Sequence, residues 1–356
     1  MRKMMKAVQL TSTGELRLIE TQEPTLSRSD EIMLRMHAVG ICGSDLHYFK
    51  EGGIGGRAIE QAWIVGHEGA GTVAQVGGEV SRFKPGDRVV FDPNISCGTC
   101  DQCKNGRHHT CLNGRFLGCP GQLQGCLAEL VVLPESCCVS IGNSLDLNAA
   151  VLAEPLSVAL HSLRFLHDIE DTDVGVLGAG PIGLCTLMAL DSLAAKSISV
   201  TDKIAHRRES AAKWGATRTW NPDDPDIVAQ ILDNHPHGLN AVFECCGDQS
   251  ALDQAVDLLK PGGTLIITGI PSTERVSFDI SKLRRKEISV QNVRRQNNCL
   301  DEAVQWVSEN LFNIHDMITH TFSLNEAQQA FELAGRYGDG VLKAVVNVAW
   351  TPRIAR

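Results

Sequence analysis

Short apolar segments separated by glycine-rich turns fill roughly the first 150 residues of the chain. Four of them stand out, MLRMHAVGI, EGAGTVAQVG, GDRVVFD and AELVVLP, at 33–41, 68–77, 86–92 and 128–134. Runs of this length bounded by Gly and Pro are typical of β-strands, and the Pro-Gly pair at 85–86 marks a turn before one of them. The pattern predicts a mostly antiparallel, barrel-like domain.

From about residue 153 the pattern changes to apolar strands that alternate with amphipathic helices. The expected strands are DVGVLG, SISVTD, NAVFEC and GTLIITGI, at 173–178, 197–202, 240–245 and 263–270. Helices are expected between them, at 181–195, 206–216 and 251–260. Because strands that alternate with helices form parallel sheets, this part of the chain predicts an α/β, doubly wound domain.

After about residue 290 the alternation stops. SLNEAQQAFELA opens with a capping box, Ser323 followed by Glu326, and an apolar strand, LKAVVNVAW, covers 342–350. We expect this tail to return to the first domain. The predicted division is therefore a catalytic domain of residues 1–152 and 290–356 and a cofactor domain of residues 153–289.

Composition narrows the class of protein. The 356 residues are 43% hydrophobic and carry a formal net charge of −9. No apolar run approaches the roughly 18 residues that span a bilayer. Nucleic acids and anionic membranes favour clustered Lys and Arg, so we expect this acidic chain to bind neither. The N-terminus has no apolar stretch of signal-peptide length, which predicts a cytoplasmic protein.

A glycine-rich turn connects the first strand and helix of the α/β region. GVLGAGPIG places Gly178, Gly180 and Gly183 in the spacing GxGxxG. The first glycine permits a tight turn, the second lets a pyrophosphate approach the backbone, and the third lets the helix pack on the strand. We include Pro181 and Ile182, which open the helix, among the cofactor-binding residues. A strand before the motif and a helix after it predict a dinucleotide site.

An acidic residue at the end of the next strand bears on which dinucleotide binds. Asp202 lies 19 positions after the last glycine of the motif. A carboxylate there accepts hydrogen bonds from the adenosine ribose and repels a 2′-phosphate, which predicts NAD rather than NADP. Arg207 and Lys203 keep NADP open because either side chain can reach a phosphate. We include Arg207 among the cofactor-binding residues.

Thirteen cysteines in a reducing compartment are not expected to form a disulfide framework. Four of them, Cys97, Cys100, Cys103 and Cys111, have the spacing CxxCxxCx7C. Four thiolates make a closed tetrahedral zinc site with no open position for a substrate. An iron–sulfur cluster uses similar spacing, but no second cluster motif accompanies this one. The spacing therefore predicts a structural zinc, with the chemistry elsewhere.

A catalytic zinc needs mixed ligands and an open coordination position. Three short segments, GICGSDLHYF, IVGHEGAG and AEPLSVALH, supply suitable side chains: Cys42, Ser44, His47, His67, Glu68 and Glu154. Each alone has an ordinary explanation, such as a buried cysteine or a core histidine. Their combination is more informative than any single member.

Taken together, these motifs resemble the zinc-dependent medium-chain alcohol and polyol dehydrogenases along the whole chain. The matching elements are GICGSD, GHEGAGTV, FKPGDRVV, the cysteine lobe, EPLSVALH and GAGPIG. Within that family, ICGSDLHYF followed by GGIGG looks most like the sorbitol (L-iditol) dehydrogenases. So does Glu154, which stands where simple alcohol dehydrogenases have a third cysteine ligand. The resemblance implies a GroES-like β-barrel catalytic domain, a Rossmann cofactor domain and two zinc ions per chain.

The resemblance also implies roles for individual residues. Cys42 and His67 hold the catalytic zinc, and Glu68 and Glu154 either ligate it or bind a zinc-bound water; which of the two ligates stays open. In the family a hydroxyl such as that of Ser44 takes the proton of the alcohol. His47 then relays it to solvent through a ribose hydroxyl, because histidine changes charge near neutral pH. Asp45 is a candidate for orienting a ligand.

Four residues of this chain correspond to positions that line the polyol pocket of sorbitol dehydrogenases. They are Tyr48, Phe116, Arg295 and Gln296. Gln296 stands where those enzymes have a tyrosine, so the hydrogen-bonding specificity should differ. The leading prediction is NAD-linked oxidation of a polyol. L-Threonine, a sugar acid or a sugar phosphate are alternative substrates, and a catalytically silent NAD-binding sensor is an alternative of another class. Family members are commonly dimers or tetramers, so a homo-oligomer is expected.

Overall fold

The computed structural model of the chain describes residues 3–54, 57–58, 61–166 and 168–348. The chain divides into two compact units. The first comprises Met1–Glu154 and Leu300–Arg356, and the second Pro155–Cys299. The predicted boundary after residue 289 is wrong, because it falls inside β18 (Ser289–Asn292), which pairs with β17 (Leu259–Ile267) of the second unit. The second unit therefore continues to Cys299.

The first unit is built mainly from antiparallel strands. Its strands are β1 (Met4–Ser12), β2 (Glu15–Gln22), β3 (Glu31–Gly40), β4 (Gly53–Ile54), β5 (Arg57–Ala58), β6 (Trp63–Ile64), β7 (Glu68–Val76), β8 (Arg88–Phe91), β9 (Asn94–Ile95), β10 (Arg115–Phe116), β11 (Leu130–Pro134), β12 (Cys138–Ser140), β19 (Ile318–Ser323) and β20 (Lys343–Asn347). Its helices are α1 (Gly43–Glu51), α2 (Asp101–Lys104), α3 (Leu147–Ala150), α10 (Leu300–Ser308) and α11 (Ala327–Gly335), with short 3₁₀ turns η1 (His108–Thr110), η2 (Glu135–Cys137), η3 (Leu311–Met317) and η4 (Leu324–Glu326).

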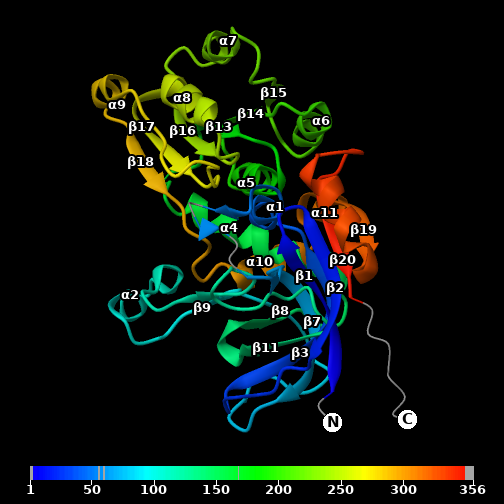
Figure 1. The fold of residues 1–356 in the computed structure, drawn as a ribbon. Helices are drawn as coiled ribbons and strands as arrows, with labels where there is room; N and C mark the ends of the chain where they lie inside the picture. Colours follow the sequence, from blue (N-terminus) through cyan, green and yellow to red (C-terminus); the bar gives the residue numbers. More distant parts are fainter. Residues whose placement is uncertain (1–2, 55–56, 59–60, 167, 349–356) are drawn as a thin grey trace. The chain divides into compact units, whose positions relative to one another are not determined.

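The largest sheet of this unit joins the two ends of the chain. Its strands follow the order β12-β8-β7-β3-β20-β19, with β11 also paired to β3. The C-terminal strand β20, red in Figure 1, lies antiparallel to β3 among the blue N-terminal strands. The predicted strand at 342–350 corresponds to β20, and its last two positions lie outside the described residues. The tail thus returns to the first unit because its apolar strand completes the sheet.

A large apolar cluster packs against this sheet. Alternate residues of β3, such as Ile32, Leu34 and Met36, are fully buried and pack with residues of β20 and α11. The capping box forms as predicted: the Ser323 backbone nitrogen donates to Glu326, at 2.8 Å. It opens the turn η4 that leads into α11. The tail is therefore anchored by a defined helix start as well as by strand pairing.

The second unit is a doubly wound parallel sheet, as the strand and helix alternation predicts. Its strands, in the order β15-β14-β13-β16-β17-β18, are β15 (Arg218–Trp220), β14 (Ser197–Thr201), β13 (Asp173–Leu177), β16 (Leu239–Glu244), β17 and β18. Its helices are α4 (Ala153–Leu163, which begins in the first unit), α5 (Pro181–Ser192), α6 (Ala205–Lys213), α7 (Ile227–Asn234), α8 (Gln249–Leu258) and α9 (Ile280–Lys286). Parallel strands linked through helices place the carboxyl ends of β13 and β16 side by side, where strand order reverses.

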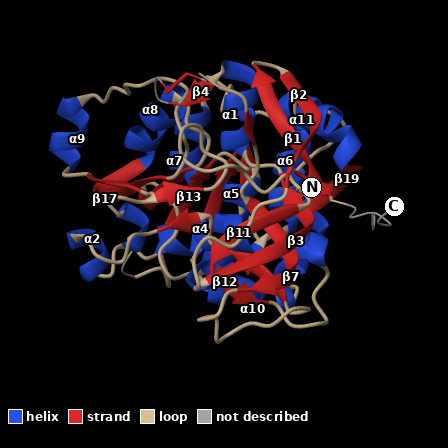
Figure 2. Ribbon diagram, turned by 60° about the horizontal axis from the view of Figure 1, so that its bottom comes forward, coloured by secondary structure: helices blue, strands red, loops and turns tan. Residues whose placement is uncertain are grey.

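Helices cover both faces of this sheet. Val242 of β16 packs with Ile231 of α7 and Leu252 of α8 in one cluster, and Figure 2 shows these helices in blue beside the red strands. The neighbouring residues Ala241 and Phe243 are also fully buried. Because successive strand residues point to opposite faces, the second face must be covered as well. Burial on both faces explains the continuous apolar runs of these strands.

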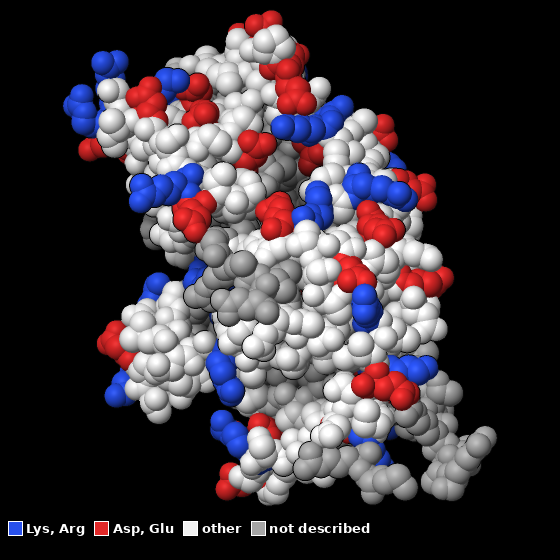
Figure 3. All heavy atoms as spheres, viewed as in Figure 1, with Lys and Arg blue, Asp and Glu red and all other residues white. Residues whose placement is uncertain are grey.

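Acidic and basic side chains are interspersed over the face shown in Figure 3, in line with the modest net charge. All thirteen cysteines are free thiols in the structure. Among the described residues, no helix is both long enough and apolar enough to cross a membrane.

Candidate functional site

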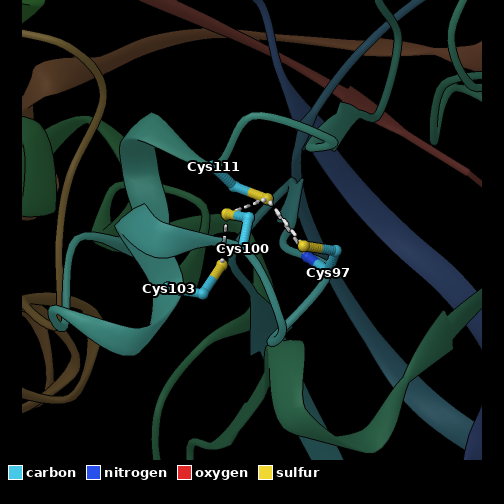
Figure 4. Close-up of side chains that lie close together, drawn as sticks. All are labelled: Cys97, Cys100, Cys103 and Cys111. Atoms are coloured by element: carbon cyan, nitrogen blue, oxygen red, sulfur yellow. Dashed lines mark hydrogen bonds between the residues drawn. The ribbon is translucent and has the colours of Figure 1, made fainter.

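The four clustered cysteines meet in a lobe of the first unit. Cys97 follows β9, Cys100 caps α2, Cys103 lies within α2, and Cys111 follows η1. The Cys97 and Cys111 sulfurs are 3.4 Å apart, those of Cys100 and Cys103 3.5 Å, and those of Cys100 and Cys111 3.8 Å (Figure 4). Thiolates that ligate one tetrahedral zinc at about 2.3 Å are separated by about 3.8 Å. The lobe therefore fits a zinc ion.

The thiols of this lobe differ in their tendency to ionise. The Thr99 hydroxyl donates to Cys97 Sγ at 3.5 Å, and this bond is the main reason why the pKa of Cys97 is lowered to about 5. Burial instead raises the pKa of Cys103 to about 11. Four thiolates together need a cation to compensate their charge, which a divalent zinc supplies.

A second cluster joins Cys42, His67 and Glu68, whose potential ligand atoms all lie within 4.8 Å of one another. Cys42 caps the N-terminus of α1, and Glu68 begins β7. Glu68 pairs with Gly40 of β3, and a Cβ at Gly40 would collide with the Glu68 carboxylate. Only glycine at this position lets the carboxylate lie against the strand. The set of thiol, imidazole and carboxylate is the mixed one that a catalytic zinc requires.

Asp45 contacts two members of this cluster, Cys42 and His67. Its side chain is fully buried, accepts a hydrogen bond from the Cys42 backbone nitrogen at 3.2 Å, and lies 3.4 Å from Nδ1 of His67. A carboxylate at Nδ1 favours the tautomer whose Nε2 lone pair is available to a metal. The structure therefore places Asp45 where an orienting partner of His67 belongs.

The electrostatics of the cluster favour a bound cation. Burial lowers the pKa of His67, but the Asp45 carboxylate and the Cys42 thiolate outweigh burial, and the pKa lies well above its usual value. The field that holds a proton on the imidazole would equally favour a metal ion in its place. Donor chemistry and charge thus both fit zinc.

Lys343 is a functional residue that the sequence interpretation missed. Its Nζ donates to both carboxylate oxygens of Glu68, at 2.8 and 2.6 Å, and to the Ile41 carbonyl at 3.1 Å. Both side chains of the pair are only 1% exposed. Burial lowers the pKa of Lys343, but Glu68 more than offsets this effect, so the amine stays charged. The available signal was a lone lysine in an otherwise apolar strand, since lysine is almost never buried unless it is paired.

The carboxyl group of Glu154 interacts electrostatically with His67 and Glu68. Burial raises the pKa of Glu154 to about 7, with His67 opposing the shift and Glu68 reinforcing it. The carboxyl group can therefore hold or release a proton near neutral pH.

Helix α1 carries three further predicted site residues, Ser44, His47 and Tyr48, on the turns that follow Cys42. Tyr48 packs edge-on against Trp63, with ring centroids 5.5 Å apart, and its hydroxyl lies 3.6 Å from Cys119 Sγ. The ring of Phe116 on β10 contacts the imidazole of His67 in a tilted arrangement, at a centroid distance of 5.3 Å. The first unit thus brings two of the four predicted pocket residues close to the mixed-ligand cluster.

The glycine-rich turn of the second unit has the geometry of a dinucleotide loop. Gly178 has φ +100°, a left-handed conformation that favours glycine, and a Cβ at Gly183 would overlap the Gly178 carbonyl oxygen. Gly180 caps α5, whose first residues are Pro181 and Ile182. The free backbone N–H groups at a helix N-terminus attract phosphate, so this loop fits a pyrophosphate.

Asp202 and Arg207 flank this loop. The Asp202 carboxylate accepts hydrogen bonds from the backbone nitrogens of Ala179 and Ile204, both at 2.8 Å. Nη1 of Arg207 lies 3.9 Å from Asp202 and would be 3.5 Å from a Cβ at Gly180. The structure thus places an acidic and a basic side chain together at the turn where a dinucleotide would bind.

The two remaining predicted pocket residues lie in the second unit. Arg295 has φ +54°, and Gln296 is 5% exposed. The Gln296 side-chain oxygen accepts a hydrogen bond from the Cys299 backbone nitrogen at 2.9 Å. That oxygen is therefore already engaged by the backbone, and its role in substrate selection stays a prediction.

Comparison with known proteins relates this geometry to established families. Residues 28–143 match the family described as alcohol dehydrogenase GroES-like domain, and residues 181–309 match the family described as zinc-binding dehydrogenase. The chain is 32% identical to sorbitol dehydrogenase of Bacillus subtilis over 343 residues, which cover 96% of this chain and 97% of the relative. It is 31% identical to L-idonate 5-dehydrogenase of Vitis vinifera, with 91% and 90% covered.

The fold is also similar to that of a solved structure. The structure of a zinc-binding dehydrogenase from Sinorhizobium meliloti, bound to NADP, superposes with a TM-score of 0.88 at 30% identity, covering 98% of this chain and 100% of that one.

Proposed function

Because the chain belongs to the zinc-dependent medium-chain alcohol and polyol dehydrogenases, with a GroES-like and a Rossmann domain, we propose that it oxidises a secondary alcohol of a polyol with NAD. One observation carries the proposal. Cys42, His67 and Glu68 meet in the first unit, where His67 and Glu68 are buried with Asp45 and Lys343, and the set matches the donors of a catalytic zinc.

We propose two zinc ions per chain. Cys97, Cys100, Cys103 and Cys111 would hold the structural ion, and Cys42 and His67 would hold the catalytic one together with Glu68 or Glu154. When bound, the catalytic zinc lowers the pKa of the substrate hydroxyl, and NAD accepts the hydride. Lys343 keeps Glu68 in place and compensates its charge, so Glu68 can serve the site without a large penalty for burial.

Ser44 and His47 move the proton of the alcohol. Both lie on α1, on the turns that follow the ligand Cys42. The Ser44 hydroxyl takes the proton from the substrate oxygen, and His47, whose side chain is 24% exposed, passes it to solvent. Asp45 holds His67 throughout, because its carboxylate faces Nδ1 of that ring.

The glycine-rich turn and Asp202 bind the cofactor. The backbone at Gly178, Gly180 and Gly183 receives the pyrophosphate, and Asp202 accepts hydrogen bonds from the ribose. We propose NAD because a fixed carboxylate at this position repels a 2′-phosphate. Arg207 lies within 3.9 Å of that carboxylate and supports the alternative, as does the NADP-bound relative, so the ratio of the two activities has to be measured.

The substrate class rests on the pocket. Tyr48 and Phe116 lie close to the mixed-ligand cluster, and we assign them to the wall that receives the polyol carbons. Arg295 and Gln296 lie in the second unit and stay candidates from the resemblance alone. A sugar acid is the second candidate, because L-idonate 5-dehydrogenase is a relative at 31% identity and an arginine can bind a carboxylate through two hydrogen bonds.

We propose that the protein acts as a homo-oligomer. In the described part of the chain, β18 ends the parallel sheet of the second unit, and Val290 on this strand is 38% exposed. An edge strand with unpaired backbone groups can pair with a second copy. Sedimentation of a Val290→Lys variant tests this surface, since a charge at the edge should produce monomers.

The function is tested by following reduction of NAD and of NADP with the purified protein and a panel of alcohols. Sorbitol, xylitol, L-iditol, galactitol, L-threonine and aldonic acids are offered with and without a chelator. We expect polyol turnover that the chelator abolishes and that Cys42→Ser removes, with NAD binding and lobe zinc retained. Turnover of acids alone would favour the second candidate. Full activity of Cys42→Ser would refute the proposed catalytic zinc.

A further inference from the structure

His47 has a carboxylate partner on its own helix. Its Nδ1 lies 3.0 Å from Oε2 of Glu51, one helical turn later on α1. A carboxylate at neutral pH only accepts hydrogen bonds, so the ring nitrogen that meets it must carry the hydrogen. The pairing therefore selects the Nδ1–H tautomer and leaves Nε2 as the basic nitrogen.

The other charged groups around His47 are engaged elsewhere. On α1, Asp45 accepts from the Cys42 backbone, and Lys50 Nζ donates to the Gly335 carbonyl at 3.0 Å. Helix α11 packs against α1, and its Glu332 accepts a hydrogen bond from Gln328 at 2.7 Å. Strand β4, which also packs against α1, has no charged residue. Among these elements, Glu51 is the charged group within reach of the His47 ring.

We infer that Glu51 is a positioning residue for proton release, because its contact with Nδ1 fixes the tautomer of His47 that leaves Nε2 as the accepting nitrogen. This inference rests on the proposed function. In the reaction, the C–H bond of the carbinol breaks as hydride passes to the nicotinamide, and the O–H bond breaks as its proton passes to Ser44. Ser44 gives up its own hydroxyl proton toward Nε2 of His47, and the imidazolium releases one proton to water. The products are one ketone, one reduced nicotinamide and one proton.

The same contact in a purely structural role would have small effects. Exposed pairs at i and i+4 stabilise a helix only slightly and have no effect on the chemical step. Glu51 is 41% exposed, so its removal should leave the melting temperature almost unchanged. A role in proton release predicts a change in the imidazole itself and in the rate of the proton step.

The first test needs no turnover. Protein labelled with ¹⁵N in its histidines is examined by NMR, and the His47 ring signals are assigned by their loss in His47→Gln. We expect the Nδ1–H tautomer in the native protein. In Glu51→Gln, whose amide can donate as well as accept, we expect a mixture of tautomers. Glu332→Gln on α11 is the matched control and should leave the His47 signals unchanged. An unchanged tautomer in Glu51→Gln would overturn the inference.

The second test measures rates. Transient NADH formation and proton release into a pH indicator are followed together, because product release can limit steady-state turnover. Since general acid–base steps are worth about 10²–10⁴-fold in all, we expect Glu51→Gln to slow the transient by about 3- to 10-fold. Glu51→Gln should not slow the transient further when His47 is already replaced in His47→Gln. Added imidazole should restore part of the rate that Glu51→Gln loses.

The outcomes separate the two proposals. An equal loss of rate from Glu51→Gln with and without His47 would overturn the role of Glu51 and leave the proposed function standing. Absence of turnover by the native protein with every alcohol would overturn the proposed function, and the assignment of Glu51 to proton release with it. The expected tautomer together with a loss of rate that depends on His47 supports both.

Discussion

Replacement of Lys343 by methionine tests the electrostatics of the buried cluster most directly. Methionine has about the length and volume of the lysine stem, so packing is preserved while the charge is removed. The change leaves the Glu68 carboxylate, which is 1% exposed, without the amine that donates to both of its oxygens. The Ile41 carbonyl loses its donor from Lys343 as well.

The size of the effect follows from this burial. Removing one partner of a buried ion pair costs about 3–5 kcal/mol, because the remaining charge is uncompensated. For a unit of this size each kcal/mol corresponds to about 2–4 °C, so we expect the metal-free protein to melt about 6–20 °C lower. Zinc should restore much of this loss, since a divalent cation beside Glu68 replaces the missing charge.

Calorimetry of the metal-free and zinc-loaded forms measures the effect, and the chain offers a matched control. Lys282 and Asp257 form an ion pair of 2.5 Å, but Lys282 is 48% exposed. Lys282→Met should cost less than about 1 kcal/mol, as exposed pairs do. The double variant Glu68→Gln with Lys343→Met should recover most of the stability. Equal, small losses from Lys343→Met and Lys282→Met would refute the reasoning.

Three further predictions concern the remaining sites. Cys100→Ser should release one zinc per chain and lower the melting temperature, and metal analysis with calorimetry checks both; normal melting with no activity would contradict a structural lobe. Asp202→Ala should weaken NAD binding and raise the NADP to NAD activity ratio about tenfold or more, if the carboxylate is worth about 1.4 kcal/mol in discrimination; an unchanged ratio would place the discrimination elsewhere. The pKa of Glu154 is raised to about 7 in the folded protein, whereas the unfolded chain releases this proton near 4.5. Between these pH values the folded protein binds more protons than the unfolded chain. The free energy of unfolding of the metal-free protein should therefore fall as pH rises from about 4.5 to 7. Denaturant titrations across this range should show a flatter profile in Glu154→Gln, and an unchanged profile would assign the pH dependence to another group.

Most features that could be predicted from the sequence depend on residues within one short stretch of the chain. The cysteine lobe depends on spacing within fifteen residues, and the glycine loop depends on a strand and a helix that follow directly. Such features are visible in one stretch of chain. The alternation of strands and helices likewise predicted the parallel sheet of the second unit, since its central strands β13 and β16 are buried along most of their length and are largely apolar.

Features that depend on distant residues were not visible. Lys343 and Glu68 form an ion pair although they are 275 positions apart in the sequence, and the local sequence around either residue does not indicate this pairing. The hairpin of β1 and β2 was missed because most residues of β2 are at least partly exposed, which weakens the apolar alternation. Gln296 shows a different limit of sequence reasoning, and its role in the pocket stays a prediction. Its place in the motif suggested a pocket residue, but its side-chain oxygen binds the Cys299 backbone. Position in a motif does not determine which hydrogen bonds a side chain makes.

The return of the tail to the first unit has a consequence for biosynthesis. A ribosome that adds about 5–20 residues per second needs roughly 14 to 55 s to proceed from Glu68 to Lys343. During that time the second unit, which is continuous in sequence, can fold. The sheet of the first unit still lacks β20, and the Glu68 carboxylate lacks its amine. The buried ion pair of Glu68 and Lys343 can therefore form only after the whole second unit has been synthesised.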